Sequence, residues 1–124
     1  MHLDHVQLPM PPGGEDEADA FYRDLLGLTP VAKPENLAVR GGRWYGVGAL
    51  QIHLGVDPAH APSTTAHVCF VTHDYDALHR RLVDEGCAPV VDTRLATIQR
   101  FYCTDPFGNR IEIQEGPDAT DVDR

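Results

Sequence analysis

The chain has 124 residues, a size typical of one compact domain, and its 42% hydrophobic content excludes a disordered chain. It contains no apolar run of about 18 residues that could cross a bilayer. Ten basic and nineteen acidic residues give a formal net charge of −9, which disfavours nucleic acid and membrane surfaces as partners.

The first half of the chain predicts the element order βαβββ. Residues 2–8 alternate in character before a stretch rich in Pro and Gly, which predicts a short strand. Residues 15–26 place apolar side chains at helical spacing, and Gly27 follows, which predicts a helix. Three further strands are expected at residues 28–32, 42–47 and 50–56.

The second half predicts the same order after a connecting segment. Residues 57–64 are rich in Pro and polar residues, as a connection between two packed units would be. A strand at 65–72 precedes a helix that is entered by Asp74 and ended by Gly86. Three more strands are expected at residues 89–93, 98–103 and 110–115, the last two joined by the turn Thr-Asp-Pro-Phe-Gly-Asn.

These two halves predict an α+β fold in which two βαβββ modules form a metal-binding cavity. A unit of about 60 residues would be only marginally stable alone, so we expect the two modules to share one core in a single domain, residues 1–116. Its modules would be 1–56 and 65–116, with 57–64 as linker. The acidic residues 117–124 are expected to form a flexible tail.

Four potential metal ligands share one face of the predicted strands. Because side chains alternate across a strand, the apolar residues sort to one face and the polar residues to the other. The polar face carries two candidate ligands in each half, one near its start and one near its end: His5, His53, His67 and Glu112. Imidazole and carboxylate bind divalent Zn, Ni, Co, Fe or Mn. Two alternatives stay open: four ligands, or three ligands with the fourth residue as a base.

Several motifs support this interpretation through a resemblance. They are Leu-Asp-His-Val near the start, Phe-Tyr-Arg-Asp-Leu-Leu-Gly-Leu at 21–28, Ile-His-Leu at 52–54, Ala-His-Val at 66–68 and Asp-Pro-Phe-Gly-Asn-Arg-Ile-Glu-Ile at 105–113. Over about residues 2–115 the chain resembles the vicinal oxygen chelate superfamily. That superfamily includes glyoxalase I, extradiol ring-cleaving dioxygenases, fosfomycin-resistance thiol transferases and metal-free bleomycin-binding proteins.

The resemblance implies that the four candidate ligands occupy the metal positions of the superfamily. His5, His67 and Glu112 match the two-histidine, one-carboxylate arrangement of the dioxygenases and thiol transferases. The chain differs from glyoxalase I at His53, where those enzymes usually carry a carboxylate. One divalent transition metal is therefore expected as the cofactor.

We expect the protein to be a metal-dependent enzyme that carries out glyoxalase-like lyase or isomerase chemistry on a small molecule with two adjacent oxygens. Glu112 and His53 are the predicted catalytic residues. Further residues predicted to contact the substrate are Gln7, Trp44, Gln51, Arg100 and Tyr102. Two alternatives are dioxygenase or thiol transferase chemistry at a His-His-Glu site and non-catalytic binding of a cationic antibiotic, which the net charge of −9 would suit.

A cytoplasmic homodimer is the expected assembly. The three cysteines are widely spaced, without a Cys-x-x-Cys pair, and no signal-like segment opens the chain. These features predict a reduced, cytoplasmic protein. A symmetric dimer is expected because it would extend or complete the cavity.

Overall fold

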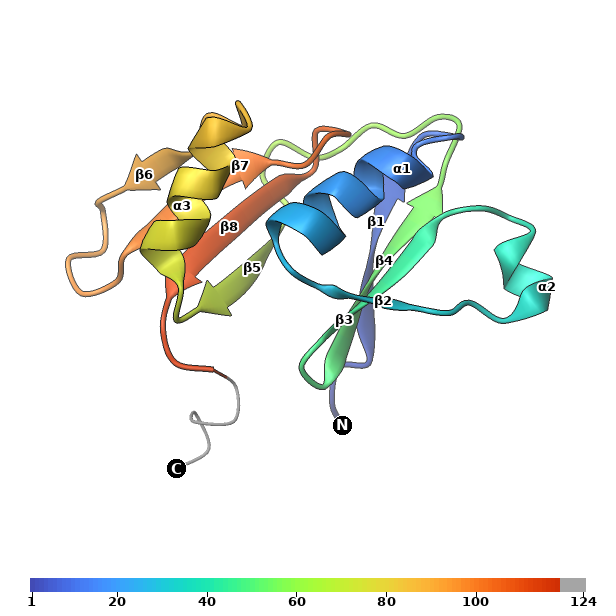
Figure 1. Cartoon of the computed structure of the whole chain (residues 1–124), viewed down its shortest axis with the longest axis horizontal. Coiled ribbons are helices and arrows are strands. Elements are labelled where there is room, and N and C mark those ends of the chain that lie inside the picture. The colour runs from blue at the N-terminus through green and yellow to red at the C-terminus, as the bar shows by residue number, and fades with distance from the viewer. Residues whose placement is uncertain (119–124) are drawn as a thin grey trace. The chain divides into compact units, whose positions relative to one another are not determined.

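The computed structural model describes residues 1–118, in which two compact units meet in sequence between Pro62 and Ser63. Each unit carries a four-stranded sheet and the same order of strands and helix (Figure 1). The predicted α+β fold of two βαβββ modules is therefore confirmed. From residue 119 onward, the predicted flexible tail lies outside the described residues.

The first unit is built on a mixed sheet with the strand order β1-β4-β3-β2. Strand β1 pairs in parallel with β4, and the other neighbours are antiparallel. Its strands are β1 (His5–Met10), β2 (Thr29–Val31), β3 (Arg43–Val47) and β4 (Leu50–Val56). A short helix, α2 (Glu35–Ala38), was not expected from the sequence; it begins after the extended Pro34.

The predicted helix over residues 15–26 has two parts. It begins as α1 (Glu15–Ala18) and continues as the π-helical segment η1 (Asp19–Leu25), where the Leu26 amide donates to the Phe21 carbonyl five residues back. Tyr22 of η1 stacks on Tyr45 of β3 with ring centroids 5.4 Å apart, and both are fully buried. This contact fastens the helix to one face of the first sheet, which leaves the opposite face for polar side chains.

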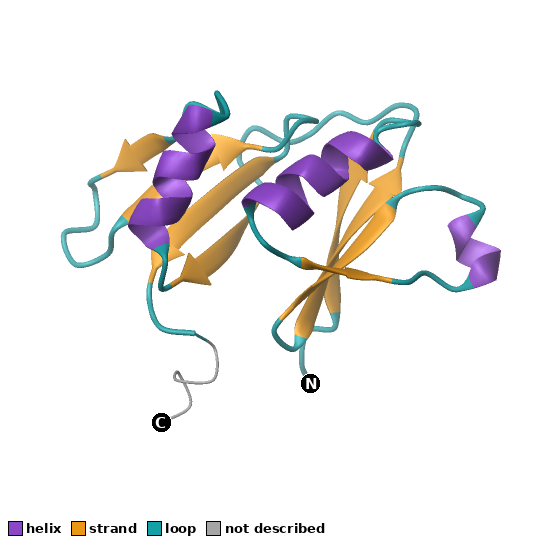
Figure 2. Cartoon of the chain, viewed as in Figure 1, coloured by secondary structure: helices purple, strands orange, loops and turns teal. Residues whose placement is uncertain are grey.

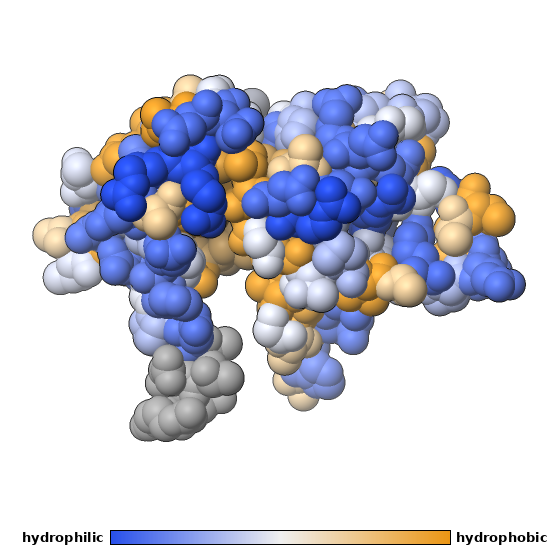
Figure 3. All heavy atoms as spheres, viewed as in Figure 1, coloured by the Kyte–Doolittle hydropathy of each residue, from blue (hydrophilic) through white to orange (hydrophobic). Residues whose placement is uncertain are grey.

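The second unit repeats this construction with the strand order β5-β8-β7-β6, and β5 is parallel to β8. Its helix α3 (Tyr75–Asp84) buries Leu78 and Leu82, while its outward side is hydrophilic (Figures 2 and 3). Its strands are β5 (His67–Thr72), β6 (Val90–Asp92), β7 (Arg100–Thr104) and β8 (Arg110–Glu115).

The bounds of several strands differ from those predicted. The strand expected at 65–72 begins at His67, because the Ser63 hydroxyl accepts the amides of Thr65 and Ala66 and forms a turn there. Strands β4 and β8 have the bounds that the sequence predicted. Within residues 1–118, no helix combines the length and the apolar character that a membrane span requires.

Candidate functional site

The register of the first sheet gathers a polar cluster on the face away from η1. Gln7 of β1 and Trp44 of β3 both lie opposite His53 of β4. His5 of β1 lies opposite Gln51 of β4. We call these five residues the first-sheet cluster; it contains two of the four predicted ligands and three of the predicted substrate contacts.

Three aromatic rings of this cluster form a continuous stack. The rings of Trp44 and His53 lie 4.1 Å apart with planes inclined by 7°, and those of His53 and His5 lie 4.1 Å apart at 14°. His53 is almost completely buried, with 5% exposure. Burial lowers the pKa of His53, and the neighbouring His5 lowers it further. His53 is therefore a neutral imidazole at neutral pH.

Hydrogen bonds determine which ring nitrogen of each histidine is left for another partner. His5 Nδ1 lies 2.8 Å from Asp4 Oδ2 and donates to it, so Nε2 is the nitrogen left for another partner. His53 Nε2 lies 2.8 Å from Gln51 Oε1, which leaves the lone pair on Nδ1. The two histidines thus offer different nitrogens to a ligand or metal.

The second sheet carries a matching cluster on the face away from α3. Parallel pairing places Cys69 of β5 opposite Glu112 of β8, and antiparallel pairing places Tyr102 of β7 opposite the same Glu112. The full second-sheet cluster consists of His67, Cys69, Arg100, Tyr102, Arg110, Glu112 and Gln114.

Glu112 is the centre of the second-sheet cluster and is 4% exposed. Its Oε1 lies 3.0 Å from His67 Nε2, and its Oε2 accepts from Gln114 Nε2 at 2.7 Å. Burial raises the pKa of Glu112, but hydrogen bonds from Gln114, Tyr102 and other neighbours outweigh it, so the net pKa lies below its usual value. Glu112 is therefore ionised at neutral pH.

Arg100 joins this carboxylate to a second one. Its guanidinium lies 3.0 Å from Asp92 Oδ2 and 3.5 Å from Glu112 Oε2, and its side chain is only 13% exposed. Asp92 also pairs with Arg94, whose hydrogen bonds hold the pKa of Asp92 well below its usual range. Arg100, one of the predicted substrate contacts, is thus also a counter-ion of Glu112.

Cys69 also faces Glu112, and its thiol is protonated at neutral pH in the metal-free protein. Partial burial and the nearby carboxylate raise the pKa of Cys69 to about 12. Tyr102 is a hydrogen-bond partner of Glu112 as well, and its ring lies edge-on to that of His67 with centroids 5.4 Å apart. The carboxylate is therefore surrounded by donors from three strands.

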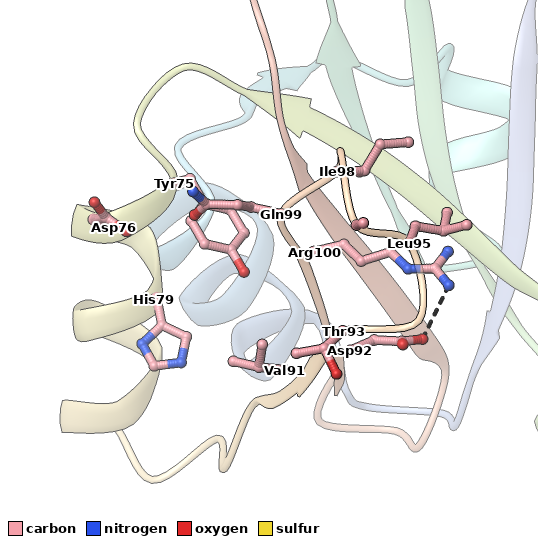
Figure 4. A pocket seen from close by; sticks show the side chains of 11 residues that line it. Tyr75, Asp76, His79, Val91, Asp92, Thr93, Leu95, Ile98, Gln99 and Arg100 are labelled. Atoms are coloured by element: carbon pink, nitrogen blue, oxygen red, sulfur yellow. Dashed lines mark hydrogen bonds and ion pairs between the residues drawn. The ribbon is translucent and has the colours of Figure 1, made fainter.

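A pocket of about 400 Å³ opens between α3 and the β6–β7 connection of the second unit (Figure 4). Arg100 and Asp92 line it and are the only members of the Glu112 network that do so; none of the predicted metal ligands reaches it. Its lining is Tyr75, Asp76, His79, Val91, Asp92, Thr93, Leu95, Ala96, Ile98, Gln99 and Arg100. The pocket therefore adjoins the second-sheet cluster through Arg100, and its lining includes none of the four candidate ligands.

Comparison with protein families identifies the chain. The sequence profile of the Glyoxalase/Bleomycin resistance protein/Dioxygenase superfamily matches residues 2–113. The chain belongs to this superfamily. A curated member, "Glyoxylase I 4" from Arabidopsis thaliana, is 29% identical over 109 residues, which cover 79% of this chain. The match spans 62% of the length of that relative.

Solved structures of the glyoxalase superfamily share the fold. A glyoxalase family protein from Bacillus anthracis is 39% identical with a TM-score of 0.88, covering 94% of this chain and 96% of that one. Lactoylglutathione lyase from Agrobacterium tumefaciens is 22% identical with a TM-score of 0.71, covering 93% of each chain. A variant of the fosfomycin resistance protein FosX from Listeria monocytogenes, solved with Mn(II) and 1S,2S-dihydroxypropylphosphonic acid, is 15% identical with a TM-score of 0.78 and covers 99% and 98%.

The donor atoms of the second sheet fit the divalent metal that this superfamily implies. Among the described residues, no three His, Cys, Asp or Glu side chains form a ready cluster. Both ring nitrogens of His67, however, face oxygens that accept: Nδ1 lies 2.7 Å from the Thr65 carbonyl oxygen, and Nε2 lies 3.0 Å from Glu112 Oε1. Such a pair needs a proton or a cation between its atoms.

The two side chains also suit a metal chemically. An imidazole nitrogen and a carboxylate oxygen are both ligand types for divalent transition metals. His67 and Glu112 would therefore be the two residues of the second sheet that hold such a metal.

Proposed function

We propose that the protein is a divalent-metal-dependent enzyme of the glyoxalase superfamily that isomerises or cleaves a small molecule bound through two adjacent oxygens. The four proposed metal ligands are His5, His53, His67 and Glu112. The observation that carries the proposal is the 3.0 Å contact between His67 Nε2 and the buried carboxylate of Glu112, two ligand types that bind divalent transition metals. Membership of the superfamily supports the proposal, as does the presence of two candidate ligands on the polar face of each sheet.

The metal, when bound, supplies Lewis-acid polarisation of the substrate oxygens. Glu112 and His53 are the groups proposed to move a proton, because both are buried and both are unprotonated at neutral pH. Arg100 and Gln114 hold Glu112 Oε2, so Oε1 remains the oxygen directed at His67. The other predicted contacts, Gln7, Trp44, Gln51 and Tyr102, line the same polar faces and are proposed to orient the substrate.

The proposed metal site combines the two candidate ligands of the first sheet with the two of the second sheet. His67 and Glu112 supply two ligands, and His5 and His53 supply the other two, either from the same chain or from a second copy. We propose a homodimer as the assembly. Light scattering of the metal-loaded protein should then give a mass twice the 13.7 kDa of one chain.

Turnover by the reconstituted protein tests the proposal. Protein loaded in turn with Ni, Co, Zn, Mn or Fe(II) is incubated with methylglyoxal plus a thiol, and the product is followed by NMR. We expect turnover with at least one metal, lowered at least about 100-fold by Glu112→Gln. Glu115→Gln is the matched control, because Glu115 lies on the same strand, is exposed and points to the opposite face.

The outcomes separate the proposal from its alternatives. Equal activity in Glu112→Gln and Glu115→Gln would contradict the proposed role of Glu112. Turnover of a catechol with Fe(II) and oxygen, but none of methylglyoxal, would favour ring cleavage. Bleomycin binding by metal-free protein, without any turnover, would favour an antibiotic-binding protein.

A further inference from the structure

Arg110 occupies the same face of the second sheet as the proposed ligands. It precedes Glu112 by two residues on β8 and lies opposite His67 of β5 in the parallel pairing. Neighbouring strands are about 4.8 Å apart, and two residues along a strand span about 6.7 Å. The backbone therefore places Arg110 beside both proposed ligands of the second sheet.

The Arg110 guanidinium is held in place by two contacts. Its central carbon lies 4.0 Å from the ring centroid of Tyr102, and its Nη1 donates to the Thr64 carbonyl at 3.4 Å. Tyr102 is itself a hydrogen-bond partner of Glu112. A stacked guanidinium keeps its donors at the edge of its plane, where they can meet an anion.

No carboxylate of the described residues pairs with Arg110. Arg100 differs in this respect, because its guanidinium forms ion pairs with both Asp92 and Glu112 and is largely buried. Arg110 is half-buried, so its free edge meets solvent on the polar face. In a chain with a net charge of −9, an unpaired arginine beside the proposed ligands is a local site for negative charge.

We infer that Arg110 is the anion-binding residue of the site and that the substrate carries a carboxylate or phosphonate group next to its two chelating oxygens. The inference rests on the proposed function for the place where the substrate binds. A planar guanidinium binds two anionic oxygens in parallel, a geometry that suits both groups. From the sequence, Arg100 rather than Arg110 is the arginine predicted to contact the substrate.

Three matched chelators test this inference. Acetohydroxamate presents two adjacent oxygens without a charged group, whereas malonohydroxamate adds a carboxylate and phosphonoacetohydroxamate adds a phosphonate. Each is titrated calorimetrically into metal-loaded wild-type protein, Arg110→Gln and Arg80→Gln. Arg80 is an exposed arginine on α3, so its variant makes the same change in net charge away from the site.

We expect wild-type protein and Arg80→Gln to bind at least one anionic chelator about tenfold or more tightly than acetohydroxamate. Arg110→Gln should lose this preference and keep its affinity for acetohydroxamate. The chelator that is preferred distinguishes a carboxylate from a phosphonate substrate. No preference in wild-type protein, or the same preference in Arg110→Gln, would overturn the inference.

A failure of the proposed function would be visible separately. If the protein takes up no metal, the proposed function fails, and metal-free protein is titrated with inorganic phosphate instead. Weaker phosphate binding by Arg110→Gln than by Arg80→Gln would still support Arg110 as an anion site. Equal binding by the two variants would overturn it.

Discussion

Each candidate histidine has one ring nitrogen committed to a hydrogen-bond acceptor. The acceptors are the Asp4 carboxylate for His5, the Gln51 amide for His53 and the Thr65 carbonyl for His67. Such partners fix the tautomer and the orientation of a histidine that binds a metal. At the scale of single residues, these partners therefore determine which lone pairs the protein offers.

The Asp4 carboxylate provides the first prediction. Asp4→Ala removes the acceptor of His5 Nδ1 and should weaken metal binding about 10- to 100-fold without removing any proposed ligand. Competition with a chromophoric chelator measures the change. Asp24→Ala is the control, because Asp24 is also exposed and pairs only with its neighbour Arg23 among the described residues. Equal affinities of the two variants would contradict a role for Asp4.

The pH dependence of stability provides a second prediction. Burial lowers the pKa of His53 in the folded protein, so the unfolded chain takes up a proton first as the pH falls. Stability contributed by neutral His53 is present above pH 6.5, the ordinary pKa, and is lost as the pH falls toward the folded pKa. Metal-free wild-type protein should therefore lose more stability between about pH 7.5 and about pH 5.5 than His53→Gln does.

Urea denaturation at the two pH values measures this difference. The window lies above the range in which the carboxylates with lowered pKa values, such as Glu112, take up protons. Equal losses of stability in wild-type protein and His53→Gln would show that His53 does not supply the dependence.

Among the elements, the turn between β7 and β8 depends on one buried carboxylate. Asp105 is 4% exposed and accepts hydrogen bonds from the Phe107 amide at 2.9 Å and the Asn109 amide at 2.8 Å. Its second oxygen accepts from the Asn109 side chain at 2.8 Å. Because β8 carries Glu112 and Arg110, this turn sets the register of the second-sheet cluster.

Asp105→Ala should lower the free energy of unfolding by about 2–4 kcal/mol, because buried amides lose their acceptor. Urea denaturation measures the loss. Asp57→Ala is the matched control: Asp57 accepts the Ala59 amide at 2.9 Å in a similar but exposed turn, so its loss should be much smaller. Comparable losses in the two variants would contradict the importance of burial.

Patterns of neighbouring residues predicted the strands whose side chains alternate between apolar and polar. Strands β4 and β8 alternate apolar and polar residues, and their bounds agree with the prediction. The four residues of α2 offer no periodicity to detect, and the π-helical hydrogen bonds of η1 depend on packing of Tyr22 against Tyr45, which lies far along the chain. Propensity cannot reveal such contacts.

The candidate site was predictable in part for the same reason. Strand parity placed His5 with His53 and His67 with Glu112 on common faces, as the registers show. The pairing of Arg100 with two carboxylates, 8 and 12 residues away, depends on the register of β7 and was not visible in the sequence. The donors at the edge of the Arg110 guanidinium are left exposed because its plane stacks on Tyr102. The sequence motif at residues 105–113, which contains Arg110, does not reveal this stacking.

At the scale of the whole molecule, each unit contributes one pair of candidate ligands on an equivalent sheet face. A metal held by both pairs would need both units, so the loss of one ligand from each pair should abolish binding. Divalent metals require at least three protein ligands at a site of this type. The proposed metal site therefore depends on ligands from both pairs.

The metal content of tag-free protein, purified without chelators and measured beside His5→Ala/His67→Ala, tests this claim most directly. We predict about one equivalent of a transition metal per chain in wild-type protein and none in the double variant. No metal in wild-type protein after reconstitution, or an equal content in the double variant, would contradict the proposed metal site.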